Sequence, residues 1–403
     1  MRLYSLIDSG RTVNGGLPFG QTDDMFLALF QHTLRIGINA ETARKIIFAT
    51  KSDNKGKNMN SAEYIRNISE IMMMPLAAKA LCVAAEIGIA DKIGDRGSNI
   101  AELAKACHVC EKNVFDIIKV LEVFGFFEVK DESIIKNNAR SSLLMSDHAS
   151  SMKHFCMLFG NEYYQGFDGL LHTCHTGTSG FKQVFGLTLY EHLAHSASRA
   201  EIYDLAMRDL SRPVGYVLAK EYASLFAKAG SVVDIGGGSG VILIEIIKQY
   251  HNLTGCLFDM TGVCSRSEKS VAQSSPELKE RMVFTPGSFF EAIPSGYDIY
   301  LLKNILHNWN DEFCLKILKA IAQSLGHSTL LIIEPLLEHD ETSPRLLMNA
   351  LFQSVICQDG TRYRTLEDME DILTLSGLTI VGTKKITTGH TVIEIKLNAA
   401  PQR

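Results

Sequence analysis

Residues 232–240 read Val-Val-Asp-Ile-Gly-Gly-Gly-Ser-Gly, and this stretch constrains the fold more than any other part of the chain. An apolar run that ends in an acid and enters a glycine-rich turn predicts a buried strand, a loop and a helix. Gly236 and Gly238 allow a positive φ and a close approach by a ligand, because they have no Cβ. A helix that begins near Val241 would direct its N-terminal amides into the same space. We therefore expect a cofactor site at this turn.

The spacing of the glycines excludes two common kinds of nucleotide site. No Lys-Ser or Lys-Thr pair follows them, so a phosphate-binding loop is not predicted. A dinucleotide fingerprint requires a third spaced glycine, and Val241 occupies that position. Asp234 before the glycines and Asp259 at the end of the next apolar run suit a ligand with a free ribose and an amino-acid tail. This combination favours S-adenosylmethionine, and the alternative is a glycine turn that only packs a helix on a sheet.

Three later stretches carry a more specific signal. They are Leu-Phe-Asp-Met at 257–260, Gly-Ser-Phe-Phe at 287–290 and Tyr-Leu-Leu-Lys-Asn-Ile-Leu-His-Asn-Trp-Asn-Asp-Glu at 300–312. Together with the glycine loop, they resemble the S-adenosylmethionine-dependent O-methyltransferases that act on plant phenolics and bacterial polyketides. The resemblance extends over about residues 60–395, and the stretch at 300–312 is its most specific part.

The order of apolar segments predicts an α/β fold in the second half of the chain. We expect strands at 231–235, 255–259, 282–285, 297–302, 329–334, 378–385 and 391–397, separated by helices. This order implies a mostly parallel sheet with helices on both faces and a reversed strand at its C-terminal end. The resemblance implies the same architecture, a Rossmann-like doubly wound methyltransferase domain with an N-terminal all-α and winged-helix dimerisation domain.

Four segments are expected along the chain. Residues 1–57 form a helical extension and linker, with helices predicted at 23–30 and 40–49, and 58–150 form the winged-helix dimerisation domain. Residues 151–220 form a helical connector that lines the acceptor pocket, and 221–403 form the catalytic domain that binds the cofactor. The extension lies outside the resemblance. It is interpreted as a clasp for oligomerisation or as a regulatory arm.

A winged helix by itself also predicts DNA binding, so a transcription factor is the competing interpretation. The exposed side of the helix at 114–124 would carry Asp116, Lys119 and Glu122. This mixed set cannot neutralise phosphates, and the net charge of −5 gives no support to a nucleic-acid or anionic membrane surface. The resemblance implies instead that this segment pairs two copies of the chain in a homodimer.

The polar residues near the predicted strand ends define the cofactor site. Asp259 is expected to accept both ribose hydroxyls, Phe289 to stack on adenine, and Lys303 to hold the cofactor carboxylate or the sheet edge. The complete predicted set of cofactor-binding residues is Asp234, Gly236, Gly238, Asp259, Ser288, Phe289 and Lys303.

Methyl transfer requires a hydroxyl that is aligned behind the sulfonium carbon and loses its proton during attack. His307 is the candidate base, and Glu334 at the end of the following strand would fix its tautomer. Helix capping is the alternative role for His307. A small aromatic or polyketide-like acceptor is expected to bind Phe159, Tyr164, Phe167, Met207, Asn308, Asn349 and Tyr363.

Three residues depart from the pattern of the family. Asn308 and Tyr363 stand where acids often flank the base, and Ser288 stands where an Asp often precedes the aromatic residue beside adenine. These departures keep a second function open, in which bound S-adenosylmethionine acts as a fixed cation in a pericyclic rearrangement, dehydration or decarboxylation.

The nine cysteines contain no CxxC pair, and Cys107 and Cys110 have no second ligand pair at a suitable distance. No metal site is therefore predicted, and free thiols in a reducing cytoplasm account for the cysteines. The N-terminus carries no long apolar segment behind a basic start, so no secretion signal or membrane span is predicted.

Overall fold

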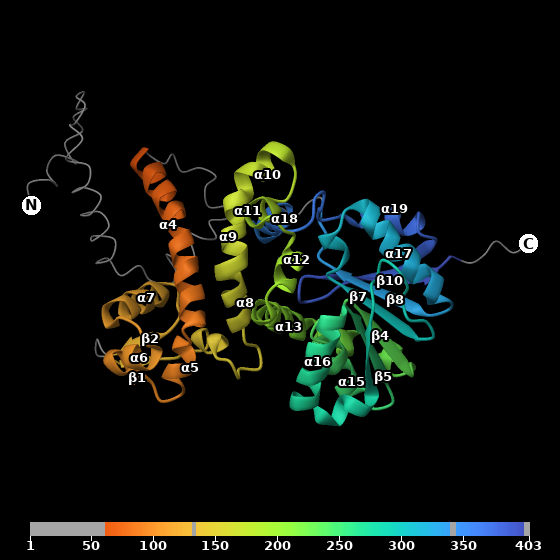
Figure 1. Cartoon of the computed structure of the whole chain (residues 1–403), viewed down its shortest axis with the longest axis horizontal. Coiled ribbons are helices and arrows are strands. Elements are labelled where there is room, and N and C mark those ends of the chain that lie inside the picture. Colours follow the sequence, from red (N-terminus) through yellow and green to blue (C-terminus); the bar gives the residue numbers. More distant parts are fainter. Residues whose placement is uncertain (1–60, 131–133, 339–343, 399–403) are drawn as a thin grey trace, which may run out of the picture.

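The structure is a computed structural model that describes residues 61–130, 134–338 and 344–398. Helix α4 and a small sheet lie at one end of the molecule, the large sheet lies at the other, and a group of helices lies between them (Figure 1). The helices predicted at 23–30 and 40–49 fall outside the described residues. The proposed division of the chain into four segments stays a prediction.

The N-terminal region contains the helices and the hairpin that its sequence predicts. Asn99 begins one helix, since its side chain accepts a hydrogen bond from the Glu102 amide at 2.8 Å. The strands form an antiparallel sheet of order β1-β3-β2. The elements are α4 (Ser61–Glu86), α5 (Ile89–Ile93), β1 (Ser98–Asn99), α6 (Ile100–Cys107), α7 (Glu111–Val123), β2 (Glu128–Lys130), β3 (Ile134–Lys136) and the 3₁₀ turn Ser141–Leu144.

The exposed charges of α7 pair with one another. Lys112 Nζ lies 2.8 Å from Asp116 Oδ2, and Lys119 pairs with Glu122. This helix therefore presents no basic surface to a phosphate backbone, as the sequence indicated.

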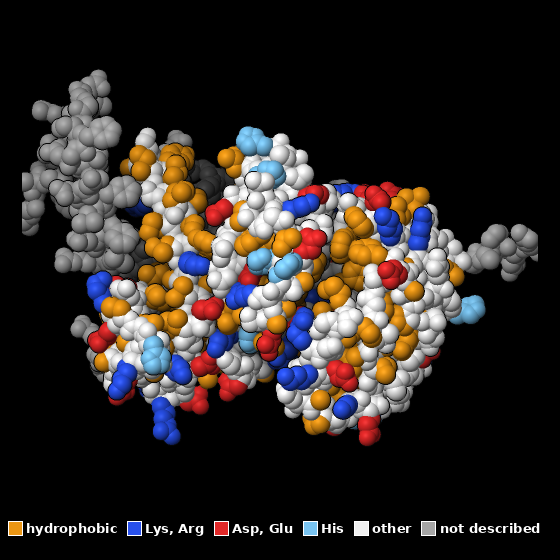
Figure 2. All heavy atoms as spheres, in the orientation of Figure 1, with side chains coloured by type: hydrophobic (Ala, Val, Ile, Leu, Met, Phe, Trp, Pro, Cys, Tyr) orange, Lys and Arg blue, Asp and Glu red, His pale blue; other side chains and the backbone are white. Residues whose placement is uncertain are grey.

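Helix α4 has a buried C-terminal end and an exposed apolar N-terminal part. Its buried residues are Ala80, Cys82, Ala84 and Ala85. Apolar side chains gather along α4 on the face that Figure 2 shows. By length and composition α4 could cross a membrane, and 17% of its most apolar window is buried. The large exposed apolar residues on it are Tyr64, Ile65, Ile68, Ile71, Met72, Met73 and Leu76.

The central helices are rich in aromatic residues. The longest of them, α13, packs against both α8 and α15, and so joins the central helices to the C-terminal region. The elements are α8 (Lys153–Leu158), a π-helical turn (Phe159–Tyr163), α9 (Tyr164–Gly166), a 3₁₀ turn (Phe167–Gly169), α10 (Leu170–Thr176), α11 (Gly180–Phe185), α12 (Leu189–Ala194), α13 (Ala197–Glu221) and α14 (Ala223–Phe226).

The C-terminal region forms a seven-stranded sheet of order β6-β5-β4-β7-β8-β10-β9. Strands β4 to β8 pair in parallel, and β10 runs antiparallel to both β8 and β9, so the predicted reversed strand is confirmed. The strands are β4 (Ser231–Ile235), β5 (Thr254–Asp259), β6 (Met282–Pro286), β7 (Ile299–Lys303), β8 (Thr329–Glu334), β9 (Leu378–Lys385) and β10 (Thr391–Leu397).

Successive strand residues point to opposite sides of this sheet, and helices cover both sides, so both faces are buried. Val232 joins the hydrophobic core that contains α13 and α15, whereas Val233 joins the core that contains α17 and α19. The α/β fold with helices on both faces is therefore as predicted. The helices of this region are α15 (Val241–Gln249), α16 (Thr261–Ser274), the 3₁₀ turns Pro276–Arg281 and Leu306–Asn308, α17 (Asp311–Leu325), α18 (Pro344–Ile356) and α19 (Leu366–Thr374).

Candidate active site

The five parallel strands bring the predicted polar residues to one edge of the sheet. Asp234 is the penultimate residue of β4, and Asp259, Lys303 and Glu334 end β5, β7 and β8. Ser288 follows β6. The carboxyl ends of parallel strands meet at a single edge, which is where α/β sheets bind their ligands.

The glycine loop, residues 236–240, adopts the backbone conformation that its composition predicts. Gly236 and Gly238 have φ of 67° and 57°. The Gly238 amide donates a hydrogen bond to Asp259 Oδ2 at 2.9 Å, and the Met260 amide donates to Asp259 Oδ1 at 2.7 Å. Burial raises the pKa of Asp259, while these two amides lower it. Both carboxylate oxygens thus accept one backbone hydrogen bond, and each keeps a lone pair for a ligand.

Two buried oxygens at this edge have no hydrogen-bond partner among the described residues, Asp234 Oδ2 and Asn304 Oδ1. Burial, together with the neighbouring Asp259, raises the pKa of Asp234 to about 7. Unpaired buried oxygens are costly, and a ligand with N–H and O–H donors would satisfy them. The residues present therefore fit the ribose and the amino-acid tail of S-adenosylmethionine.

Lys303 lies in the same part of the site. Its Nζ donates a hydrogen bond to Ser211 Oγ on α13 at 2.8 Å, and burial lowers its pKa to about 8. Ser211 was not predicted, because no sequence signal connects the middle of a helix with a strand end 92 residues away.

Phe289 lies beside the glycine loop, where the sequence predicted an adenine contact. A Cβ on Gly236 would lie 3.6 Å from Phe289 Cε1. The ring of Phe289 also meets Trp309 edge to face, with centroids 6.0 Å apart. Ser288 is turned toward its own loop, since its Oγ accepts a hydrogen bond from the Phe290 amide at 3.3 Å.

His307 and Glu334 are in direct contact. His307 Nδ1 lies 2.5 Å from Glu334 Oε2, and the Leu306 amide donates to Glu334 Oε1 at 2.9 Å. Burial raises the pKa of Glu334, but the adjacent His307 more than offsets this and holds the pKa below its usual value. Asn310, not His307, caps α17, because its Oδ1 accepts a hydrogen bond from the Phe313 amide. Helix capping therefore does not explain His307.

Arg364 holds the loop around His307 in place. Its guanidinium donates to the Leu306 carbonyl at 2.8 Å and to the Trp309 carbonyl at 2.9 Å, and it pairs with Asp311 at 2.7 Å. Sequence reasoning missed this buried arginine. The adjacent Tyr363, which stands where the family often has an acid, stacks on the His307 imidazole with centroids 6.0 Å apart.

The predicted acceptor residues lie in four places. Phe159, Phe167 and Met207 lie in one apolar cluster, in which the rings of Phe159 and Phe167 are 5.6 Å apart. Tyr164 turns toward α4, where its hydroxyl donates to the Pro75 carbonyl at 3.2 Å. Asn308 and Tyr363 lie beside His307, and Asn349 lies on α18.

Two tyrosines that the sequence did not single out connect these groups. The Tyr190 ring stacks near Trp309, with centroids 6.4 Å apart, and meets the Tyr203 ring edge to face at 6.1 Å. Burial raises the pKa of both phenols, that of Tyr190 to about 12. Aromatic residues are frequent in this stretch of the sequence, and their spacing alone does not separate Tyr190 from residues that only pack.

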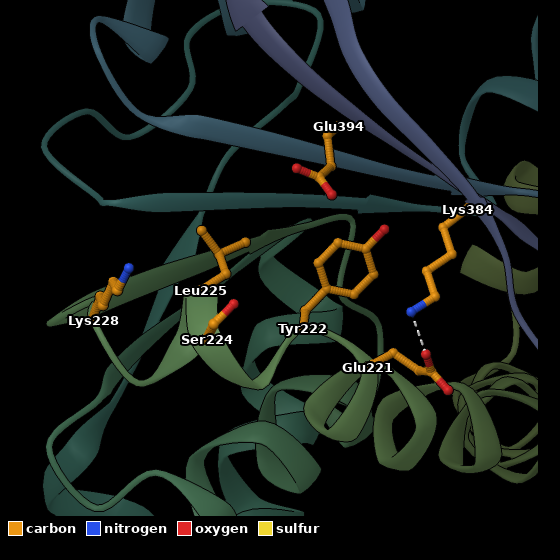
Figure 3. Close-up of a pocket in the computed structure, with 7 residues that line it drawn as sticks. All are labelled: Glu221, Tyr222, Ser224, Leu225, Lys228, Lys384 and Glu394. Atoms are coloured by element: carbon orange, nitrogen blue, oxygen red, sulfur yellow. Dashed lines mark ion pairs between the residues drawn. The ribbon is translucent and has the colours of Figure 1, made fainter.

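A pocket of about 340 Å³ lies elsewhere, between the end of α13 and strands β9 and β10. Its lining includes Lys228 and Ser224, and Tyr222 projects between Glu394 and Lys384 (Figure 3). No predicted site residue lines this pocket.

Comparisons with known proteins agree with the geometry of the strand ends. The O-methyltransferase domain matches residues 167–379, which is more than half of the chain. The chain belongs to the O-methyltransferase family. O-methyltransferase SfmM3 of Streptomyces lavendulae is 27% identical over 325 residues, covering 79% of this chain and 96% of the relative.

Two solved structures extend the comparison. The mitomycin 7-O-methyltransferase MmcR is 25% identical with a TM-score of 0.75, covering 83% of this chain and 98% of that one. NcsB1 from neocarzinostatin biosynthesis, solved with S-adenosylmethionine and a naphthoic acid, shares the fold, with 23% identity, a TM-score of 0.65 and coverage of 80% and 96%. The protein is an S-adenosylmethionine-dependent O-methyltransferase, and these comparisons do not support the alternative of non-methyl chemistry.

Proposed function

We propose that this O-methyltransferase methylates a phenolic or enolic hydroxyl of a small aromatic acceptor, with His307 as the general base. The observation that carries the proposal is the contact of 2.5 Å between His307 Nδ1 and Glu334 Oε2. Glu334 is itself fixed by the Leu306 amide, so the imidazole has one orientation. A proton on Nδ1 that is donated to Glu334 leaves the Nε2 lone pair to face the acceptor.

S-adenosylmethionine, when bound, supplies an electrophilic methyl group on a positively charged sulfur. His307 Nε2 removes the acceptor proton while the acceptor oxygen forms its bond to the methyl carbon and the carbon–sulfur bond breaks. The imidazolium that results lies against the Glu334 carboxylate, which stabilises its charge. The products are the methyl ether and the uncharged thioether, and His307 returns its proton to solvent.

Substitution His307→Ala tests the base. We expect kcat to fall by about 10²–10⁴-fold, because positioned proton transfer contributes this much. The dissociation constant for S-adenosylhomocysteine, measured by calorimetry, should not change. His251→Ala, at an exposed histidine, is the matched control. Wild-type turnover by His307→Ala would rule out the base assignment.

The acceptor class follows from the apolar cluster of α8 to α13 and α18, which suits a flat ring. Related enzymes act on mitomycin or are solved with a naphthoic acid, and this supports an aromatic acceptor for this chain. Mass spectrometry with phenolic and polyketide acceptors would test it. Methylated acceptor with an equal amount of S-adenosylhomocysteine is expected, whereas an isomerised or dehydrated acceptor with intact cofactor would indicate non-methyl chemistry.

We further propose that the protein is a cytoplasmic homodimer that pairs through its N-terminal winged-helix segment. All nine cysteines are free thiols, as a reducing compartment requires. The exposed side chains of Ile68 and Met72, 63% and 71% accessible, mark the apolar face of α4 that a second copy would cover. The double variant Ile68→Glu, Met72→Glu should sediment as a monomer. Loss of binding to lipid vesicles in that variant, with no change in mass, would point to a membrane instead.

A further inference from the structure

The buried amide of Gln353 on α18 has no role in the chemistry described so far. Its side chain is 3% exposed, and its Oε1 has no hydrogen-bond partner among the described residues. Protein interiors rarely leave such an oxygen unpaired, because it gives up its hydrogen bond to water on folding and gains none in return. A ligand that donates a hydrogen bond would remove this cost.

Gln353 lies on α18, a helix that contacts both the apolar cluster and the loop of His307. The Cys357 amide donates to the Gln353 carbonyl at 2.9 Å, so the helical turn continues and the two side chains share one face. On that face the Cys357 thiol donates to Asn308 Oδ1 at 3.4 Å, next to His307. The neighbouring Phe352 meets the Tyr163 ring at 4.8 Å, within the apolar cluster.

The polar groups of this face carry no charge. Asn308 is neutral, its Nδ2 donates to the Asn304 carbonyl at 3.0 Å, and its Oδ1 is occupied by the thiol. Burial raises the pKa of Cys357 to about 12, so the thiol keeps its proton. The face therefore offers one unsatisfied acceptor, Gln353 Oε1, and no charge that would attract an ion.

We infer that Gln353 determines acceptor specificity by accepting a hydrogen bond from the bound acceptor. The acceptor then carries a second neutral O–H or N–H group in addition to the hydroxyl that is methylated. This inference rests on the proposed function, because it places the acceptor between the apolar cluster and His307. A site built around such a hydrogen bond discriminates strongly against analogues that lack the donor.

Two probes of the same shape test this inference. Calorimetry would compare 2,3-dihydroxynaphthalene with 3-methyl-2-naphthol on protein loaded with S-adenosylhomocysteine. The wild type should bind the dihydroxy compound at least about tenfold more tightly, because only it offers the second donor. Gln353→Met keeps the length of the side chain and removes its amide, so it should reduce the preference to near unity. Gln183→Met, at an exposed glutamine, should preserve the preference.

A stability measurement separates ligand recognition from a structural role. Without ligand, Gln353→Met should raise the midpoint of thermal unfolding, because it removes an unpaired buried oxygen. Equal affinity for the two probes, no binding of either, or a lower midpoint in Gln353→Met with an unchanged preference would overturn the inference. His307→Ala should keep the preference, so failure of the base assignment and failure of this inference are distinguishable.

Discussion

The cofactor side and the acceptor side of this site are built from different secondary-structure elements and different types of residue. On the cofactor side, the glycine loop and the ends of four neighbouring strands supply backbone amides and short acids such as Asp259. On the acceptor side, helices from two separate parts of the chain supply rings and amides such as Tyr190 and Gln353. The first side is fixed by sheet hydrogen bonds, whereas the second depends on how helices pack. A change on one side should therefore leave ligand binding on the other side intact.

Asp259→Asn should give the largest separation between the two sides. The variant keeps the shape of the side chain and removes its charge, and a hydrogen bond to a charged group contributes about 1.5–3 kcal/mol, or roughly tenfold to a hundredfold in cofactor affinity. Calorimetry with S-adenosylhomocysteine would measure this loss. Asp298→Asn is the control, since Asp298 accepts hydrogen bonds from the Gly230 and Ser231 amides at the opposite edge of the sheet. Equal losses in the two variants would contradict a ribose contact by Asp259.

Gly236→Ala should weaken cofactor binding by about tenfold, because a Cβ costs roughly 1–2 kcal/mol at positive φ and crowds the loop. The added Cβ would lie 2.6 Å from Ile305 Cδ1. Gly389→Ala provides the control, since Gly389 has φ of 84° but no atom within 4 Å of an added Cβ. Both variants should lose thermal stability, and only Gly236→Ala should lose cofactor affinity. Unchanged affinity in Gly236→Ala would place the cofactor elsewhere.

Tyr190→Phe should affect the acceptor side alone. It removes the buried hydroxyl of a ring that lies between Trp309 and Tyr203, and the loss of one neutral hydrogen bond of about 1 kcal/mol to the acceptor should raise its KM severalfold. The affinity for S-adenosylhomocysteine should stay at the wild-type value. Tyr300→Phe is the control, since its hydroxyl donates to the Ser324 carbonyl at 2.9 Å away from the site. A larger effect on cofactor affinity than on KM would contradict the idea that the two sides bind their ligands independently.

The smallest expected effect is a pH dependence on the cofactor side. The folded protein keeps a proton on Asp234 up to a pKa of about 7, whereas an unfolded aspartate releases it near pH 4. The folded state therefore binds more protons between these values, and the stability of the ligand-free protein should fall as pH rises across this window. Cofactor affinity should rise severalfold between pH 6 and 8, because the ionised acid attracts a cationic ligand. Asp234→Asn should abolish both trends in thermal unfolding and calorimetry.

Periodicity and turn chemistry were sufficient to predict the strand ends. Apolar runs located all seven strands, with β7 starting at Ile299 rather than at 297. Their parallel order then brought Asp234, Asp259 and Glu334 to one edge, because each crossover connection makes the next strand run in the same direction as the one before it. The pairing of His307 with Glu334 followed from the same topology.

Other residues could not be assigned from the sequence, because their roles depend on contacts between distant helices. Tyr164 was predicted to bind the acceptor, yet its hydroxyl contacts Pro75 on α4. Tyr190 is another aromatic residue of the same stretch, and its ring lies beside Trp309. A single rotation of a short helix decides which ring faces the site, and local spacing does not encode that rotation.

The fold class, the glycine loop and the order of the strand ends can be predicted from the sequence, since they depend on backbone conformation and on periods of two and 3.6 residues. The contacts of Arg364 with the His307 loop, and of Cys357 on α18 with Asn308, become visible only in the folded protein. Those contacts join segments that are far apart in the chain, and they depend on side-chain packing that local sequence patterns do not encode.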